Sequence, residues 1–114
     1  MEAKTLEPAF TALADAEKSM HELHEGCCSA TRAPCIAELG DTLEETRDSL
    51  ERLPSDLSIG DVIITTIEDV GGQLGRLQVG CCTPKRMPLY AQLLEDLTKV
   101  ERTVKRALKQ NLHQ

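Results

Sequence analysis

The five cysteines are the residues of this sequence with the most distinctive chemistry, and they fall into two groups. Cys27, Cys28 and Cys35 lie in the first third of the chain, and Cys81 and Cys82 form an adjacent pair much later. Thiolates bind soft metal ions, thiols form disulfides, and buried cysteines pack as small apolar side chains. The residue types allow all three uses, so the spacing has to discriminate among them.

Metal binding would combine several of these thiolates with His24, which lies one helical turn before Cys27. Structural zinc sites usually contain cysteine pairs separated by two or more residues, whereas the pairs here are adjacent. A thiol-based protein that binds Zn²⁺ or Cu⁺ is therefore an alternative and not the leading hypothesis. Its candidate ligands are Cys27, Cys28, Cys35, Cys81, Cys82 and His24.

Disulfide bonds between the two cysteine groups are a second alternative. A bond from the Cys27–Cys28 pair to the Cys81–Cys82 pair would stabilise the fold by about 4 kcal/mol in the loop-entropy model. The odd number of cysteines and an intracellular location would both disfavour this arrangement. If such a disulfide bond forms, we expect the chain to be an extracellular, disulfide-stapled four-helix ligand or inhibitor.

Catalytic motifs are missing from the sequence. The segment His21-Glu22-Leu23-His24-Glu25 places its histidines three residues apart, whereas the zinc-protease motif H-E-x-x-H places them four apart. The glycines between Gly71 and Gly75 lack the register of a phosphate-binding loop, and no serine lies in a nucleophile elbow. We therefore expect a protein that is not an enzyme and has no cofactor.

Composition narrows the classes of partner. A net charge of -6 and 2% aromatic residues argue against nucleic acid, because phosphate backbones attract basic surfaces and bases stack on aromatic rings. No long apolar run or signal-peptide core is present, so we expect a cytoplasmic chain, or a secreted one if it is a mature fragment. Membrane attachment is expected only if a Cys-Cys pair is palmitoylated.

Apolar residues recur at three- and four-residue steps along most of the chain, which predicts an all-α fold. Gly26, Pro34 and Pro54 mark helix boundaries. The predicted helices span residues 5–25, 34–53, 58–80 and 88–112. Because the connections are short, we expect one domain, 1–114, folded as an antiparallel up-down-up-down four-helix bundle. This topology would bring all five cysteines to one end.

The third helix has a competing interpretation. Residues 62–67 are rich in β-branched side chains, and Gly71-Gly72 could form the turn of a hairpin across 62–79. Leu74 and Leu77 keep helical spacing, which favours a helix whose glycines mark a bend or a close helix contact. Ser55 or Ser58 would cap it, the latter in a segment that resembles a capping box.

The leading functional hypothesis is a non-enzymatic protein–protein interaction module, an adaptor or a subunit of a helical assembly. The last helix carries more apolar residues than one seam requires, so we expect an exposed apolar groove that binds an amphipathic helix or a second copy. Its candidate residues are Leu89, Tyr90, Leu93, Leu94 and Leu97. The cations Arg102, Lys105, Arg106 and Lys109 are interpreted as complementing the dipole of that helix.

Overall fold

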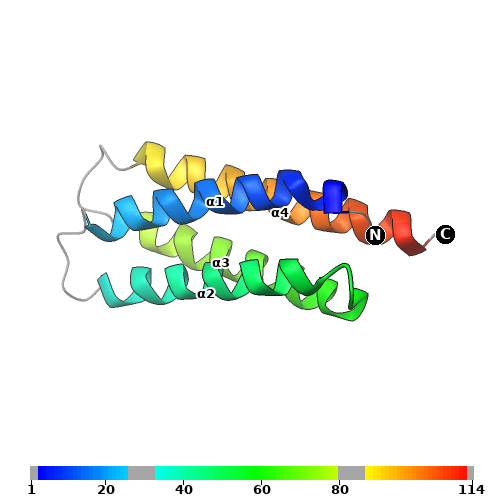
Figure 1. Cartoon of the computed structure of the whole chain (residues 1–114). Coiled ribbons are helices and arrows are strands. Elements are labelled where there is room, and N and C mark those ends of the chain that lie inside the picture. Colours follow the sequence, from blue (N-terminus) through cyan, green and yellow to red (C-terminus); the bar gives the residue numbers. More distant parts are fainter. Residues whose placement is uncertain (1–2, 26–32, 80–86, 113–114) are drawn as a thin grey trace.

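Four α-helices form the chain in the computed structural model, which describes residues 3–25, 33–79 and 87–112 (Figure 1). They are α1 (Ala3–Glu25), α2 (Ala33–Arg52), α3 (Gly60–Val79) and α4 (Met87–Leu112), with a 3₁₀ turn, η1 (Leu57–Ile59), before α3. The predicted all-α fold is confirmed, and each helix boundary lies within two residues of its expected position. The alternative hairpin across 62–79 is wrong, because α3 is continuous through this segment.

The helices are arranged as the corners of a square in which each helix packs against the two next to it. α1 packs against α2 and α4, and α3 packs against the same two helices from the opposite corner. Figure 1 shows the N-terminus, the α2–α3 connection and the C-terminus at one end of the bundle. α1 and α3 end, and α2 and α4 begin, at the other end, as expected for the up-down-up-down order.

The core of the bundle is almost entirely aliphatic. Every helix contributes residues at steps of three or four, and Tyr90 of α4 is the only aromatic residue among those that are fully buried. Burying such side chains contributes roughly 1.5–3 kcal/mol each, so this continuous stripe is the main stabilising feature of the fold. Its largest members are Leu6, Leu13, Leu23, Ile36, Leu43, Leu50, Leu53, Ile63, Ile67, Leu74 and Leu93.

α1 and α4 form the most extensive helix pair. α1 buries the small residues Ala9, Ala12 and Ala16, and Ala12 lines the seam with α4 beside Asp96 and Lys99. Alanine carries no side chain beyond Cβ, so the axes of two helices can approach closely where alanines face the partner helix. α4 is thereby held along most of the length of α1.

The start of α3 differs from the expected cap. Asp56, not Ser55 or Ser58, is the capping residue: its Oδ1 accepts a hydrogen bond from the backbone N–H of Ser58 at 3.2 Å. The Ser58 hydroxyl also donates to this carboxylate oxygen. The cap therefore closes η1, and α3 begins two residues later than predicted, at Gly60.

The glycines of α3 have different surroundings. A Cβ added at Gly71 would lie 3.9 Å from Leu94 of α4, whereas Cβ atoms added at Gly72 and Gly75 would meet nothing within 4 Å. The expected close helix contact is therefore wrong for Gly72 and Gly75. A Cβ at Gly60, in contrast, would lie 2.5 Å from Leu108 Cδ1.

Replacing exposed Gly72 by Ala should stabilise the protein by about 1 kcal/mol, because Ala restricts the unfolded chain and favours the helix. The matched substitution Gly60→Ala should give no gain or a small loss, because Leu108 has to move. Urea unfolding followed by circular dichroism measures both. The Gly60→Ala penalty should disappear in a Leu108→Ala background, and equal effects at the two glycines would contradict this packing.

Candidate functional site

The thiol and imidazole groups singled out in the sequence can be located in part. Cys35 and His24 are both exposed, near the bundle end at which the first and third connections lie. Cys27, Cys28, Cys81 and Cys82 lie outside the described residues. Within the described ranges, no group of three or more His, Cys, Asp or Glu side chains is arranged to hold a metal ion. The disulfide and metal alternatives therefore stay predictions.

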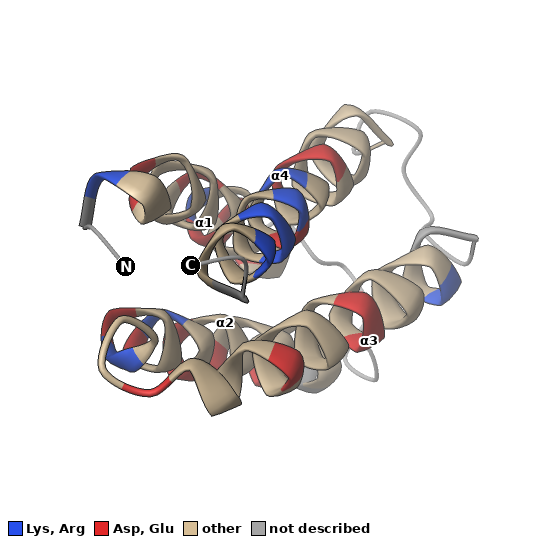
Figure 2. Cartoon of the chain, turned by 90° about the vertical axis from the view of Figure 1, so that its right-hand side faces the viewer, with Lys and Arg blue, Asp and Glu red and all other residues tan. Residues whose placement is uncertain are grey.

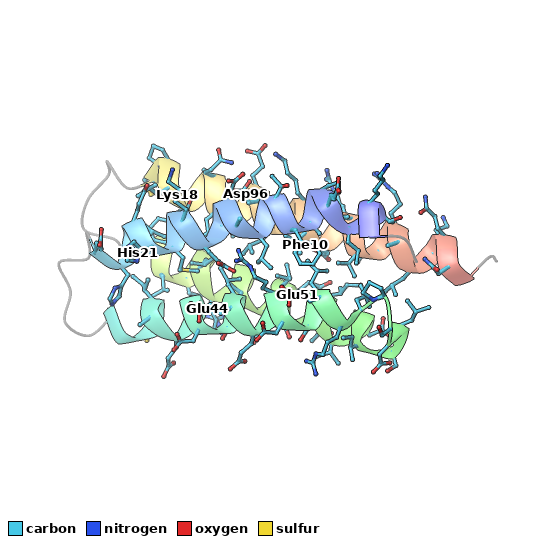
Figure 3. All side chains as sticks on the ribbon, in the orientation of Figure 1. Phe10, Lys18, His21, Glu44, Glu51 and Asp96 are labelled. Atoms are coloured by element: carbon cyan, nitrogen blue, oxygen red, sulfur yellow. The ribbon has the colours of Figure 1, made fainter. Side chains whose placement is uncertain are left out.

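A shallow groove of about 230 Å³ lies beside these residues, between α1 and α2. Its apolar floor includes the buried side chains of Met20 and Ile36. His21 is on its rim, near the end of α1 (Figure 3), and its Nε2 lies 3.0 Å from Oε1 of Glu25. The sequence singled out His21 and His24 as histidines on one helix and Met20 and Ile36 as core residues, but it did not bring them together, because they come from two separate helices. The remaining lining residues are Glu17, Ala37, Gly40, Asp41 and Glu44.

Glu17 is the most enclosed charge of this groove, with 23% of its side chain exposed. Its Oε2 lies 2.9 Å from Nη2 of Arg47, which joins α1 to α2, while its Oε1 is buried without a hydrogen-bond partner. Burial raises the pKa of Glu17, and Glu44 raises it further, against the lowering effect of Arg47. The single ion pair thus offsets only part of the desolvation of this carboxylate.

The five apolar residues predicted to bind a partner do not form an open groove. Tyr90, Leu93 and Leu97 are buried in the core, and Leu89 and Leu94 are partly buried and pack against it. These candidates are therefore core or core-flanking residues in this structure, and partner binding through them stays a prediction. The additional apolar residues of α4 are explained by its two neighbours, since α4 has to cover both α1 and α3.

Asp96 of α4 is a buried carboxylate that the sequence pattern did not reveal. Only 1% of the residue is exposed; its Oδ1 accepts a hydrogen bond from Gln92 Nε2 at 3.1 Å, and its Oδ2 has no partner. It lines two surface hollows along the seam between α1 and α4, one of them shared with Lys18 and Ser19 (Figure 3). Burial raises the pKa of Asp96, against the lowering effect of the Gln92 hydrogen bond.

Four exposed cations form a regular row on the outer surface of α4. We call Lys99, Arg102, Arg106 and Lys109 the basic stripe; their spacing of three, four and three residues places them on one face of the helix. None of the four lies within ion-pair distance of a described carboxylate. Figure 2 shows the basic segments of α4 gathered toward the C-terminus.

Lys105 lies among these residues in sequence but has a different environment. Its Nζ is 2.8 Å from Oε1 of Glu101 and 3.8 Å from Oε1 of Glu68 on α3. The hydrogen bond with Glu101 raises the pKa of Lys105, and the same contact lowers the pKa of Glu101. Lys105 is thus ion-paired within its own bundle, whereas no member of the basic stripe has an ion pair with a described residue. Lys99 and Arg102 act on the bundle through longer-range charge effects, which oppose the rise in the pKa of Asp96 and add to the lowering of the pKa of Glu101, respectively.

The helix dipole accounts for only one member of the stripe. Favourable interaction of cations with a helix C-terminus is confined to the last turn, and only Lys109 lies there. Arg102 and Lys99 lie ten and thirteen residues before Leu112, where the dipole has little effect. The sequence interpretation of these cations therefore leaves most of the stripe unexplained.

Comparison of this chain with protein families, with curated proteins and with solved structures finds no significant match. No described helix combines the length with the apolar composition that a bilayer crossing requires. The geometry and charge of the described residues are therefore the basis for inferring a function.

Replacing Asp96 by Asn should stabilise the protein at pH 7 by about 1–2 kcal/mol, because a buried charge with an unpaired oxygen is removed. Since its folded-state pKa is raised, Asp96 holds its proton at pH values where the unfolded chain has lost it. Stability conferred by the protonated form is present below about pH 4 and is lost as the pH rises through the raised folded pKa. The gain from Asp96→Asn should therefore vanish at pH 3.5.

Urea unfolding at pH 7 and at pH 3.5 measures this dependence. Glu22→Gln is the matched control: it removes an exposed carboxylate of α1 that lines the same hollow and should change stability much less. A loss of stability in Asp96→Asn at pH 7 would mean that the carboxylate of Asp96 is stabilised by the fold.

Proposed function

We propose that this protein is a non-enzymatic helical interaction module that binds an acidic segment of a partner protein through the basic stripe of α4. The observation that carries the proposal is the row of four exposed cations without a described ion-pair partner. An acidic helix with carboxylates at the same spacing would neutralise all four along one face. A ten-residue span of α-helix is about 15 Å long, which suits a short helical segment.

The charge of the whole chain supports a role in recognition. The net charge is -6, so the basic stripe is a local exception on an acidic molecule. Such a distribution orients an approaching acidic partner toward α4 and repels it from the other faces. Specificity then comes from the combination of attraction at the stripe and repulsion elsewhere.

An apolar docking groove is less well supported as the binding surface. The exposed large apolar residues among those described are Leu57, Val62 and Met87, of which Val62 is the most exposed at 61%. Leu57 and Val62 lie near the α2–α3 connection, whereas Met87 begins α4 at the opposite end of the bundle. They do not form one continuous surface of the kind that an amphipathic helix requires.

The two other hypotheses depend on cysteines outside the described residues. A disulfide-stapled extracellular ligand and a thiol-based metal protein both need at least one member of the Cys27–Cys28 or Cys81–Cys82 pairs. The exposed positions of Cys35 and His24 favour neither over the other. Mass spectrometry of the unreduced protein and metal analysis separate these two hypotheses from each other.

Fluorescence anisotropy can test binding with a labelled helical peptide whose Glu residues follow the three-four-three spacing, and with a matched peptide carrying Gln instead. We expect binding of the Glu peptide only, weakened by added salt because exposed charges are screened. Neutralising two cations in Arg102→Gln/Arg106→Gln should raise the Kd about tenfold.

Lys18→Gln/Arg76→Gln provides a matched control, because it removes two exposed cations from α1 and α3 and the same net charge. This variant should bind the Glu peptide as the wild type does. Equal weakening in both variants would show a general charge effect and contradict a site on α4. Tighter binding to anionic vesicles or to single-stranded RNA than to the peptide would overturn an acidic protein segment as the partner.

A further inference from the structure

A second regular row of charges lies on α2. We call Glu38, Asp41, Glu45 and Asp48 the acidic stripe; all four are exposed, and their spacing is again three, four and three residues. Glu44 and Glu51 add carboxylates to the exposed surface of the same helix, and Figure 3 shows them along α2. The acidic stripe therefore has the length and the spacing of the basic stripe, with the opposite charge.

The two stripes cannot neutralise each other within one molecule. α2 and α4 occupy opposite corners of the bundle, with α1 and α3 between them (Figure 2). The described ion pairs join Glu17 to Arg47, His21 to Glu25, and Lys105 to two glutamates, and none of them involves a member of either stripe. Each copy thus presents two complementary and unused surfaces on opposite sides.

We infer that the acidic stripe of a second copy occupies the basic stripe, so that the protein associates with itself from α2 to α4. This inference rests on the proposed function and names its partner. With the helices antiparallel, the four pairs are Glu38 with Lys109, Asp41 with Arg106, Glu45 with Arg102, and Asp48 with Lys99. The three-four-three spacing reads the same in both directions, so all four pairs come into register.

The symmetry of the contact between copies determines which kind of assembly forms. Because two different surfaces meet, the contact is heterologous, and an open assembly keeps one unused basic stripe at one end and one unused acidic stripe at the other. The assembly therefore grows by further additions unless the rotation between copies closes a ring. Exposed ion pairs are individually weak and are screened by salt, so association is reversible and confined to low ionic strength.

Sedimentation velocity over a concentration series at low salt tests the inference with charge-neutral variants. The wild type should form dimers and larger species, whereas Arg102→Gln/Arg106→Gln and Asp41→Asn/Glu45→Gln should each be monomeric. In an equimolar mixture, the variant without Arg102 and Arg106 keeps its acidic stripe, and the variant without Asp41 and Glu45 keeps its basic stripe. These two intact stripes should bind each other and form a complex of one copy of each, which cannot grow further. Raising the salt concentration from about 25 mM to about 0.5 M should dissociate every complex, because the exposed charges are then screened.

Glu22→Gln/Asp69→Asn is the matched control for the acidic variant, since it removes two exposed carboxylates from α1 and α3. This control should associate as the wild type does. A monomeric wild type at low salt would overturn self-association but leave binding of the acidic peptide intact. Association that persists in either stripe variant or at high salt would assign it to another surface and overturn the inference.

Discussion

The packing of α1 against α4 is the contact on which the rest of this structure depends. These helices are at the two ends of the chain, so their pairing closes a bundle that would otherwise be held only by contacts between sequence neighbours. α1 buries alanines at positions 9, 12 and 16, and Ala12 lies at the seam with α4. Larger residues there would separate the helices and expose the core stripe of both.

This close packing determines what remains on the surface. α4 has to bury residues toward both α1 and α3, so Leu93 and Leu97 are used inside the bundle. It also encloses Asp96, a charged side chain whose burial is a cost that the surrounding apolar contacts offset. The exposed part of α4 includes the basic stripe, so the proposed recognition by this helix depends on charge and spacing.

The sequence is sufficient to predict the helices and their order, because period-3.6 stripes and the breakers Gly26, Pro34 and Pro54 are local signals. It is insufficient for features that depend on which helix is the neighbour. Leu94 appears as surplus apolar surface until α3 is placed beside it, and Asp96 appears as an ordinary polar residue until α1 covers it. The groove at Glu17 likewise combines residues of α1 and α2 that no spacing rule connects.

Charge partition between α2 and α4 follows from the same arrangement. In a square bundle with up-down-up-down order, the second and fourth helices lie at opposite corners. Their outer faces therefore point away from each other. Opposite charges on adjacent helices tend to pair within the molecule, as Glu17 and Arg47 do between α1 and α2. Opposite charges on the outer faces of diagonal helices cannot form ion pairs within one molecule, since the bundle separates them. Their attraction is then available only to another molecule, and the proposed self-association depends on this diagonal position of the two stripes.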